Sequence, residues 1–216
     1  MNLYTYCGND PINKYDPTGH FPWLIFAAVL LFTPFSGIVA QIAISAVSYL
    51  GILVASIFDE DIRNDMNAIG WNPFNTDESA TLNSSKVSFY KGVPVFRTNM
   101  NRSGSFGAIF LRRGSTNSAG VFQKLNDPYE LMHERGHNSQ LMRMGIANYG
   151  LMIVLPSWFE WSNRPYFERP WEITADILGG VSRETHSQAD INRGYWYLGV
   201  SSLLGLLGYF FLFGEY

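Results

Sequence analysis

LMHERGHNSQ, residues 131–140, places two of the chain's four histidines four positions apart and a glutamate directly after the first. The flanking residues predict a helix over Pro128–Met144. Asp127 is a favourable N-cap, and Glu130 completes a capping box with it. Proline suits the first helical position, and Gly145 is a suitable stop. The stretch is therefore expected to lie near the middle of a helix.

Positions i and i+4 share a helix face, so His133 and His137 are expected to point in the same direction. Two imidazoles in this arrangement can each bind one Zn²⁺ at about 2.0–2.1 Å. Glu134, which lies next to them, can take a proton from water at the metal. The same H-E-x-x-H pattern also arises by chance as an exposed polar turn. Gly136 favours the metal site, because a mid-helix glycine costs about 1 kcal/mol and is tolerated where another backbone comes close.

A catalytic zinc site needs a third protein ligand, and RPWEITADILGG, residues 169–180, supplies the best candidate. Proline can start a helix there and the glycine pair can end it. Glu172 in this helix is the expected third ligand, although an acidic residue is also favoured at a helix N-terminus by the macrodipole. Glu168 is the alternative, whereas His20 and His186 lie in polar, turn-like surroundings. The intervening apolar segment leaves room for this helix to return antiparallel to the first.

Three short strands are expected before the motif helix, which makes the fold class α+β. KVSFY (86–90) and VPVFRT (93–98) are separated by Lys91-Gly92, a tight-turn signal. SFGAIFLRR (105–113) predicts the third strand. We expect a small antiparallel sheet beside the two helices, with apolar helical segments towards both ends of the chain.

A helix bearing HExxH followed by a second bearing ExxxD resembles the gluzincin metallopeptidases. The resemblance implies a zincin-like fold, a Zn²⁺ cofactor and a protein or peptide substrate. It assigns His133, His137 and Glu172 as ligands, Glu134 as the general base, and Asp176 as the partner that orients a ligand imidazole. It also implies an edge strand for an extended substrate, for which residues 105–113 are the candidate. Tyr166 and His186 are the candidates for stabilising an oxyanion.

Three long stretches contain no charged residue: 21–35, 37–58 and 195–213. A helix needs roughly 20 apolar residues to cross a bilayer, so the second and third are long enough and the first is marginal. Tyrosines and a tryptophan near the ends of the third resemble an aromatic belt. The runs predict either membrane association or a buried helical hairpin and packed helix.

The composition excludes several classes of function. The net charge is −3 and Lys and Arg form no run, so no nucleic-acid partner is expected. A single cysteine, Cys7, excludes an internal disulfide framework and a CxxC metal knuckle. The first apolar run has no basic segment before it, unlike a usual secretory signal.

MNLYTYCGNDPINKYDPTGH, residues 1–20, closely resembles the terminal segment of the Rhs/YD-repeat core, whose pattern is NLY-x-Y-x-GN-x-P-x-N-x-x-DP-x-G. The matching residues are Asn2, Leu3, Tyr4, Tyr6, Gly8, Asn9, Pro11, Asn13, Asp16, Pro17 and Gly19. In that family a variable C-terminal toxin domain follows the segment. The resemblance implies the tip of a polymorphic toxin, secreted or at the cell surface as part of a larger Rhs protein, with a cognate immunity protein.

These expectations divide the chain into 1–20, the end of the Rhs core; 21–58, an apolar and possibly transmembrane segment; 59–194, the metallopeptidase domain; and 195–216, an apolar C-terminal helix. The leading function is a zinc-dependent peptidase toxin domain. One alternative is a membrane-disrupting toxin domain in which the metal site is structural. Another is a metal-dependent hydrolase that acts on a non-peptide bond.

Overall fold

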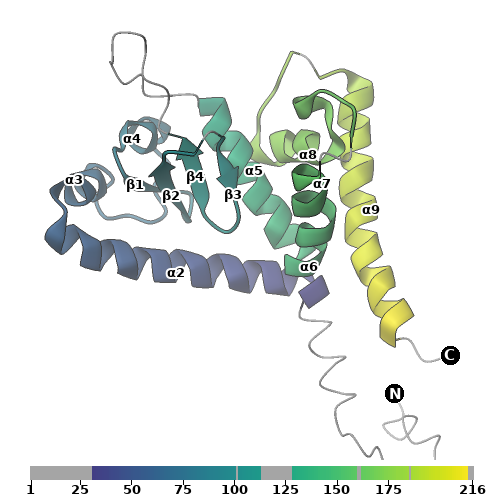
Figure 1. The fold of residues 1–216 in the computed structure, drawn as a ribbon, viewed down its shortest axis with the longest axis horizontal. Helices are drawn as coiled ribbons and strands as arrows, with labels where there is room; N and C mark the ends of the chain where they lie inside the picture. Colours follow the sequence, from purple (N-terminus) through teal and green to yellow (C-terminus); the bar gives the residue numbers. More distant parts are fainter. Residues whose placement is uncertain (1–30, 101, 113–127, 160–161, 185, 214–216) are drawn as a thin grey trace, which may run out of the picture.

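The computed structural model describes residues 31–100, 102–112, 128–159, 162–184 and 186–213, and for Pro128 and residues 202–213 the backbone alone. The N-terminal Rhs-like segment, Cys7, His20 and the expected N-cap Asp127 lie outside the described residues. The fold is α+β, as expected (Figure 1). The elements are α2 (Pro34–Phe58), α3 (Glu60–Ala68), α4 (Glu78–Asn83), β1 (Val87–Tyr90), β2 (Val93–Thr98), β3 (Gly104–Ser105), β4 (Ile109–Arg112), α5 (Pro128–Met144), α6 (Ile146–Tyr149), π-helical η2 (Gly150–Val154), α7 (Leu155–Trp158), 3₁₀-helical η3 (Tyr166–Glu168), α8 (Pro170–Gly179) and α9 (Gln188–Phe213).

The sheet has the strand order β1-β2-β4-β3 and is mixed, so the expected antiparallel sheet was wrong. β1 and β2 form the expected antiparallel hairpin, because Lys91 and Gly92 both adopt the positive φ of a two-residue turn. β2 and β4 are parallel. The stretch predicted as one strand is split by a turn at Gly107, where φ is +70°. The short β3 folds back antiparallel on β4, so β4 is an inner strand and β3 occupies the edge.

The expected motif helix is confirmed as α5, and the second helix is confirmed as α8. α8 ends at Gly180, whose left-handed φ of +80° suits glycine at a helix C-terminus. The two helices pack antiparallel through glycine contacts. A Cβ at Gly136 would clash with the carbonyl oxygen of Ala175, and one at Gly179 would clash with that of Met132. The glycine inside the motif is therefore required by close backbone approach.

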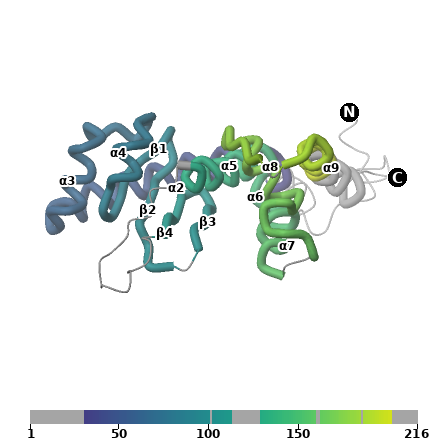
Figure 2. The backbone as a smooth tube through the Cα atoms, turned by 90° about the horizontal axis from the view of Figure 1, so that it is seen from above, coloured from purple at the N-terminus to yellow at the C-terminus, as the bar shows by residue number. Residues whose placement is uncertain are grey.

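α5 connects the two ends of the molecule. The sheet with α3 and α4 lies at one end, and α6 to α9 lie at the other (Figure 2). On the sheet side, Leu131 of α5 packs in a core cluster with Val95, Ile109 and Leu111. On the other side α5 contacts α8, which in turn packs on α9 through Gly194 and Ile173. This placement leaves the motif residues between the sheet and α8.

α2 runs along one side of the body, past the sheet and α5 (Figure 1). Its Tyr49 and Ile52 join Met66 and Phe89 in a core cluster. Among the described residues, α2 is the helix whose length and composition would allow it to cross a membrane. α9 begins at Gln188, seven positions before the apolar run expected from the sequence.

Candidate metal centre

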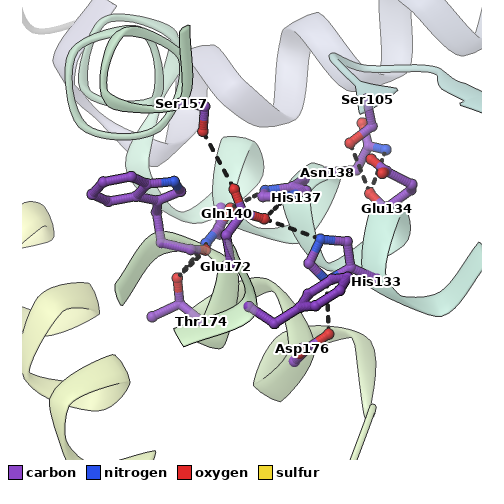
Figure 3. Close-up of polar contacts among 12 residues, drawn as sticks. Ser105, His133, Glu134, His137, Asn138, Gln140, Ser157, Glu172, Thr174 and Asp176 are labelled. Carbon is purple, nitrogen blue, oxygen red and sulfur yellow. Dashed lines mark hydrogen bonds and ion pairs between the residues drawn. The ribbon is translucent and has the colours of Figure 1, made fainter. Parts of the chain in front are cut away.

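α5 and α8 bring His133, His137 and Glu172 together in the interior. All three side chains are buried, and one potential ligand atom from each lies within 4.8 Å of the others. The Nε2 atoms of both histidines lie 3.1 Å from Oε2 of Glu172. Figure 3 shows the two imidazoles and the carboxylate directed toward one another. Ligand atoms about 2.0–2.2 Å from a tetrahedral zinc are spaced by roughly 3.3 Å, so the arrangement matches a three-ligand site.

The other nitrogen of each imidazole is held by a side-chain oxygen. Nδ1 of His133 lies 2.7 Å from Oδ1 of Asp176. Nδ1 of His137 lies 2.7 Å from Oε1 of Gln140. Both oxygens are acceptors, so each Nδ1 donates its proton, and loss of the proton on Nε2 would leave a lone pair there for a metal. The pairing of Asp176 with His133 is the one that the gluzincin resemblance implies.

Gln140 also connects the motif helix to α8. Its Nε2 donates to the backbone carbonyl of Trp171 at 2.7 Å and to the hydroxyl of Thr174. One amide therefore fixes the ring of His137 and the register of the two ligand-bearing helices. On the far side of Glu172, the hydroxyl of Ser157 lies 3.4 Å from Oε1.

Asp176 is held in turn by a basic residue from the loop after α8. Arg183 donates to both carboxylate oxygens of Asp176, at 2.7 Å from Nε and 3.3 Å from Nη2. Its guanidinium also lies 3.7 Å from the centroid of the Phe167 ring, which packs edge-on against His133. This outer layer leaves the His133 imidazole little freedom to rotate.

Glu134 occupies a different position from the three clustered residues. It is buried, and its Oε2 has no hydrogen-bond partner among the described residues. Glu134 and His133 line a cavity of about 350 Å³, together with Tyr166 and Arg102. A buried carboxylate oxygen without a partner is uncommon, and it belongs here to a residue that lines the cavity beside the cluster. It is available to accept a proton.

The site shifts the pKa values of its acids in opposite directions. Burial raises the pKa of Glu134, against the opposing charges of His137 and His133. Burial acts in the same direction on Glu172, but the positive charge of His137 and hydrogen bonds from both histidines outweigh it and hold the pKa of Glu172 well below its usual range. Burial also raises the pKa of Asp176, but hydrogen bonds from His133 and Arg183 outweigh it, so the pKa of Asp176 lies below its usual value. Two carboxylates are thus kept ionised beside one that retains a proton more readily.

The burial and charge of the cluster fit a divalent cation. Glu134, Glu172 and Asp176 are buried carboxylates, and Arg183 neutralises one of them. Buried charges need compensation. The raised pKa values of His133 and His137 favour protonated imidazoles that compensate the other two carboxylates, and a doubly charged cation that displaced the two Nε2 protons would do the same. His133, His137 and Glu172 therefore form a cluster that could bind a metal ion.

Other candidates from the sequence lie outside the cluster. Glu168 ends η3 and contributes no atom to it. His186 lies behind Asp176, with Nε2 2.9 Å from the carbonyl oxygen of Phe167 and 3.6 Å from Oδ2 of Asp176, so it supports the outer layer. Tyr166 does line the cavity.

Sequence reasoning missed two residues of the site. Gln140 lies three positions after His137 on the same helix face, and this spacing could have indicated it. Arg183 lies in a loop, where no local pattern points to Asp176.

Comparisons of the chain with protein-family models, with curated proteins and with solved structures found no match.

Proposed function

We propose that this chain carries a zinc-dependent peptidase domain of the gluzincin type. The observation that supports it best is the position of Glu134, a buried carboxylate whose Oε2 has no hydrogen-bond partner among the described residues, beside the cluster of two histidines and one glutamate. Two imidazoles and one carboxylate are the ligand set of zinc peptidases with an HExxH helix. A purely structural metal site would need no such base next to it.

His133, His137 and Glu172 would hold the ion. Zinc in such a site acts as a Lewis acid that polarises a carbonyl oxygen and lowers the pKa of water. Asp176 and Gln140 keep both imidazoles in the tautomer that presents Nε2. Glu172 is ionised before any metal binds. Burial raises its pKa, but the neighbouring histidines lower it by more.

Glu134 supplies the acid–base chemistry. Its carboxylate accepts a proton from the attacking water, and its raised pKa, caused by burial, makes it a stronger base than an exposed glutamate. The protonated acid can then transfer that proton to the leaving amine nitrogen. One side chain thus serves both halves of peptide hydrolysis.

Tyr166 is the residue that we assign to the developing oxyanion. It lies in the wall of the cavity that Glu134 and His133 also line, and it is about 38% exposed. Partial burial, followed by the charges of Glu172 and Glu134, raises the pKa of its hydroxyl, so it stays protonated and able to donate. The position suits a hydrogen-bond donor to a substrate carbonyl.

The sheet edge gives an extended substrate a place beside this cavity. β3 is an edge strand, and Arg102 and Ser103, which directly precede it, line the cavity. Ser105 in β3 donates its hydroxyl to the backbone carbonyl of Glu134 at 2.8 Å, which ties the strand to α5. The edge strand of our proposal is therefore β3, and not the whole stretch 105–113.

The biological setting is proposed from the sequence. The resemblance of residues 2–19 to the end of an Rhs core supports a toxin domain exported as part of a larger protein and neutralised by an immunity protein. A membrane-disrupting toxin with a structural metal site is the second candidate. The apolar surface of α2 favours it, since that helix could cross a membrane by length and composition.

The test uses the full chain, a peptide mixture and mass spectrometry of newly formed termini. Glu134→Gln should retain zinc but lose turnover by about 10²–10⁴-fold, since a carboxamide cannot accept the proton. Glu172→Gln should lose zinc affinity. Glu168→Gln is the matched control and should keep both zinc and activity.

Three outcomes would count against parts of the proposal. A Glu134→Gln chain that cleaves as fast as the parent would sink the peptidase mechanism. Turnover of esters or other non-peptide substrates without peptide cleavage would assign a different hydrolase. If Glu168→Gln loses the metal and Glu172→Gln keeps it, the third ligand is Glu168.

A further inference from the structure

The polarity of α2 is inverted relative to an ordinary surface helix. Every exposed residue between Pro34 and Phe58 is apolar, including Ile42 at 64%, Val47 at 70% and Leu50 at 61% exposure. Every polar residue of the helix is buried or half-buried: Ser36, Gln41, Ser45, Ser48, Tyr49 and Ser56. A helix bordered by water normally shows the opposite pattern.

The polar side chains hold this orientation in place. Nε2 of Gln41 donates to the carbonyl oxygen of Gly107, and the hydroxyl of Ser45 donates to that of Gly92, both at 2.7 Å. The hydroxyl of Tyr49 donates to the carbonyl of Trp71 at 3.2 Å. Rotating α2 to hide its apolar face would break all three bonds. The apolar face is therefore a fixed outer surface of the domain.

A lipid bilayer fits this surface better than a protein partner. The 25 residues of α2 include no charged side chain, and its exposed residues offer no hydrogen-bonding side chain. Protein interfaces usually carry a polar rim and about one hydrogen bond per 100–200 Å². The sequence from Phe21 to the start of α2 also contains no charged residue, so the uncharged stretch is longer than the helix itself.

Two arginines line a groove beside the apolar face of α2. An open groove of about 860 Å³ between α2, α5 and α9 is lined by Ile38 of the apolar face and by Arg135 and Arg143. Neither arginine has an ion-pair partner among the described residues, and Nε of Arg135 lacks a hydrogen-bond partner there. Cations next to an apolar helix face are typical of helices that bind anionic membranes in the interface.

The contacts of the inner face of α2 fit a helix that lies flat on a membrane better than one that crosses it. Its inner face carries the loops at Gly92, Gly107 and Trp71 along its length. Non-helical backbone is not tolerated against hydrocarbon, so these loops could not enter the bilayer with the helix. The cluster Asp59, Glu60 and Asp61 follows directly at its C-terminal end.

We propose that the outward face of α2 is a membrane-binding surface, which lies in the interface of an anionic bilayer with Arg135 and Arg143 at the phosphates. The inference does not depend on the peptidase proposal. It does place the metal centre: α2 contacts α5 at Leu141, and His133 lies eight residues earlier, about 12 Å along the helix. The centre would face the aqueous side, next to the membrane.

Vesicle flotation of the full chain tests the surface. The parent should float with phosphatidylcholine vesicles, and more strongly when they contain phosphatidylglycerol. Ile42→Glu/Val47→Glu should reduce binding by at least about tenfold, because two apolar side chains lose their burial. Two controls should bind as the parent does. Ile42→Leu/Val47→Leu keeps the face apolar, and Met100→Glu adds a charge at an exposed apolar residue in a loop outside α2. Arg143→Gln should lower the ratio of binding to anionic vesicles over binding to neutral vesicles by about fivefold.

Unchanged vesicle binding of the glutamate double variant would overturn the proposal. So would a parent chain that stays out of the vesicle fraction and forms a dimer that the double variant dissociates, since the face would then be a protein interface. Far-UV circular dichroism and urea unfolding, measured on each variant, show that the domain is folded whether or not it binds zinc.

Depth measurements separate a flat helix from a crossing one. Fluorophores attached to Ile38→Cys, Val47→Cys or Ile57→Cys in a Cys7→Ser chain should be quenched by brominated lipids at equal, shallow depth. A middle label deeper than the two end labels would show that α2 crosses the bilayer and would contradict the proposed orientation.

Discussion

Nδ1 of His133 lies 2.7 Å from Oδ1 of Asp176, whose carboxylate also receives two hydrogen bonds from Arg183. This chain of contacts fixes one imidazole before any metal is bound. Asp176→Asn should therefore lower zinc affinity by about 10–100-fold while the fold persists. Competition with a chelating dye would measure it. Asp190→Asn is the matched control, because Asp190 pairs with Arg193 away from the centre and should leave the affinity unchanged. Equal affinities for the two variants would remove Asp176 from the site.

Gln140 is predicted to act on the second imidazole in the same way. Gln140→Met keeps the approximate size of the side chain but removes the acceptor for Nδ1 of His137 and the donor to Trp171. Zinc affinity should fall by about 10-fold or more. Ser139→Ala on the same helix removes only a hydroxyl that bonds to the carbonyl of Arg135 and should bind zinc normally. Dye competition would again distinguish them, and full affinity in Gln140→Met would contradict the assignment.

Gly136 is predicted to be essential for the packing of the two helices. An alanine there would push against the carbonyl oxygen of Ala175, so Gly136→Ala should destabilise the fold by about 1–3 kcal/mol or more. Gly51→Ala in α2 has no atom within 4 Å of its new methyl group and should stabilise by up to about 1 kcal/mol. Urea unfolding measures both. A Gly136→Ala chain as stable as Gly51→Ala would mean that the helices are not in close contact.

The stabilisation gained from zinc is predicted to grow with pH. Burial opposes the protonation of His133, but hydrogen bonds to Asp176 and Glu172 outweigh it and raise its pKa to about 10 in the metal-free protein. A raised pKa stabilises the native state fully below the unfolded value of about 6.5, and this contribution is lost as pH rises toward 10. Zinc competes with protons, so its binding strengthens over the same range.

The measurement compares Tm with zinc and with a chelator at about pH 6.5 and about pH 8.5. The difference in Tm should widen at the higher pH. A difference that narrows would show that His133 does not exchange its proton for the metal.

The helices that carry the site could be predicted because their signals are local. Proline at the start, a glycine at the end and the i, i+4 spacing of the histidines lie within single segments, and α5 and α8 follow them. The Lys91-Gly92 hairpin also follows from its two residues. Glu172 and Asp176 are also four positions apart, and in α8 both contact His133.

The rest depends on contacts between distant segments. The stretch 105–113 reads as one strand but becomes two, because the chain turns at Gly107. Gln41 of α2, 66 positions away, donates a hydrogen bond to the carbonyl oxygen of Gly107. Arg183 reaches Asp176 from a loop. The apolar runs alone could not show that α2 turns its polar side chains inward, because this becomes visible only when its neighbours are known.

Elemental analysis of the purified full chain is the decisive measurement for the zinc site. The parent and Glu134→Gln should each carry one zinc per chain, and His133→Ala/His137→Ala should lose it. Full zinc occupancy in the histidine double variant would place the metal elsewhere. A parent that carries iron in place of zinc, or no metal after exposure to zinc, would contradict the claim that His133, His137 and Glu172 form a zinc site.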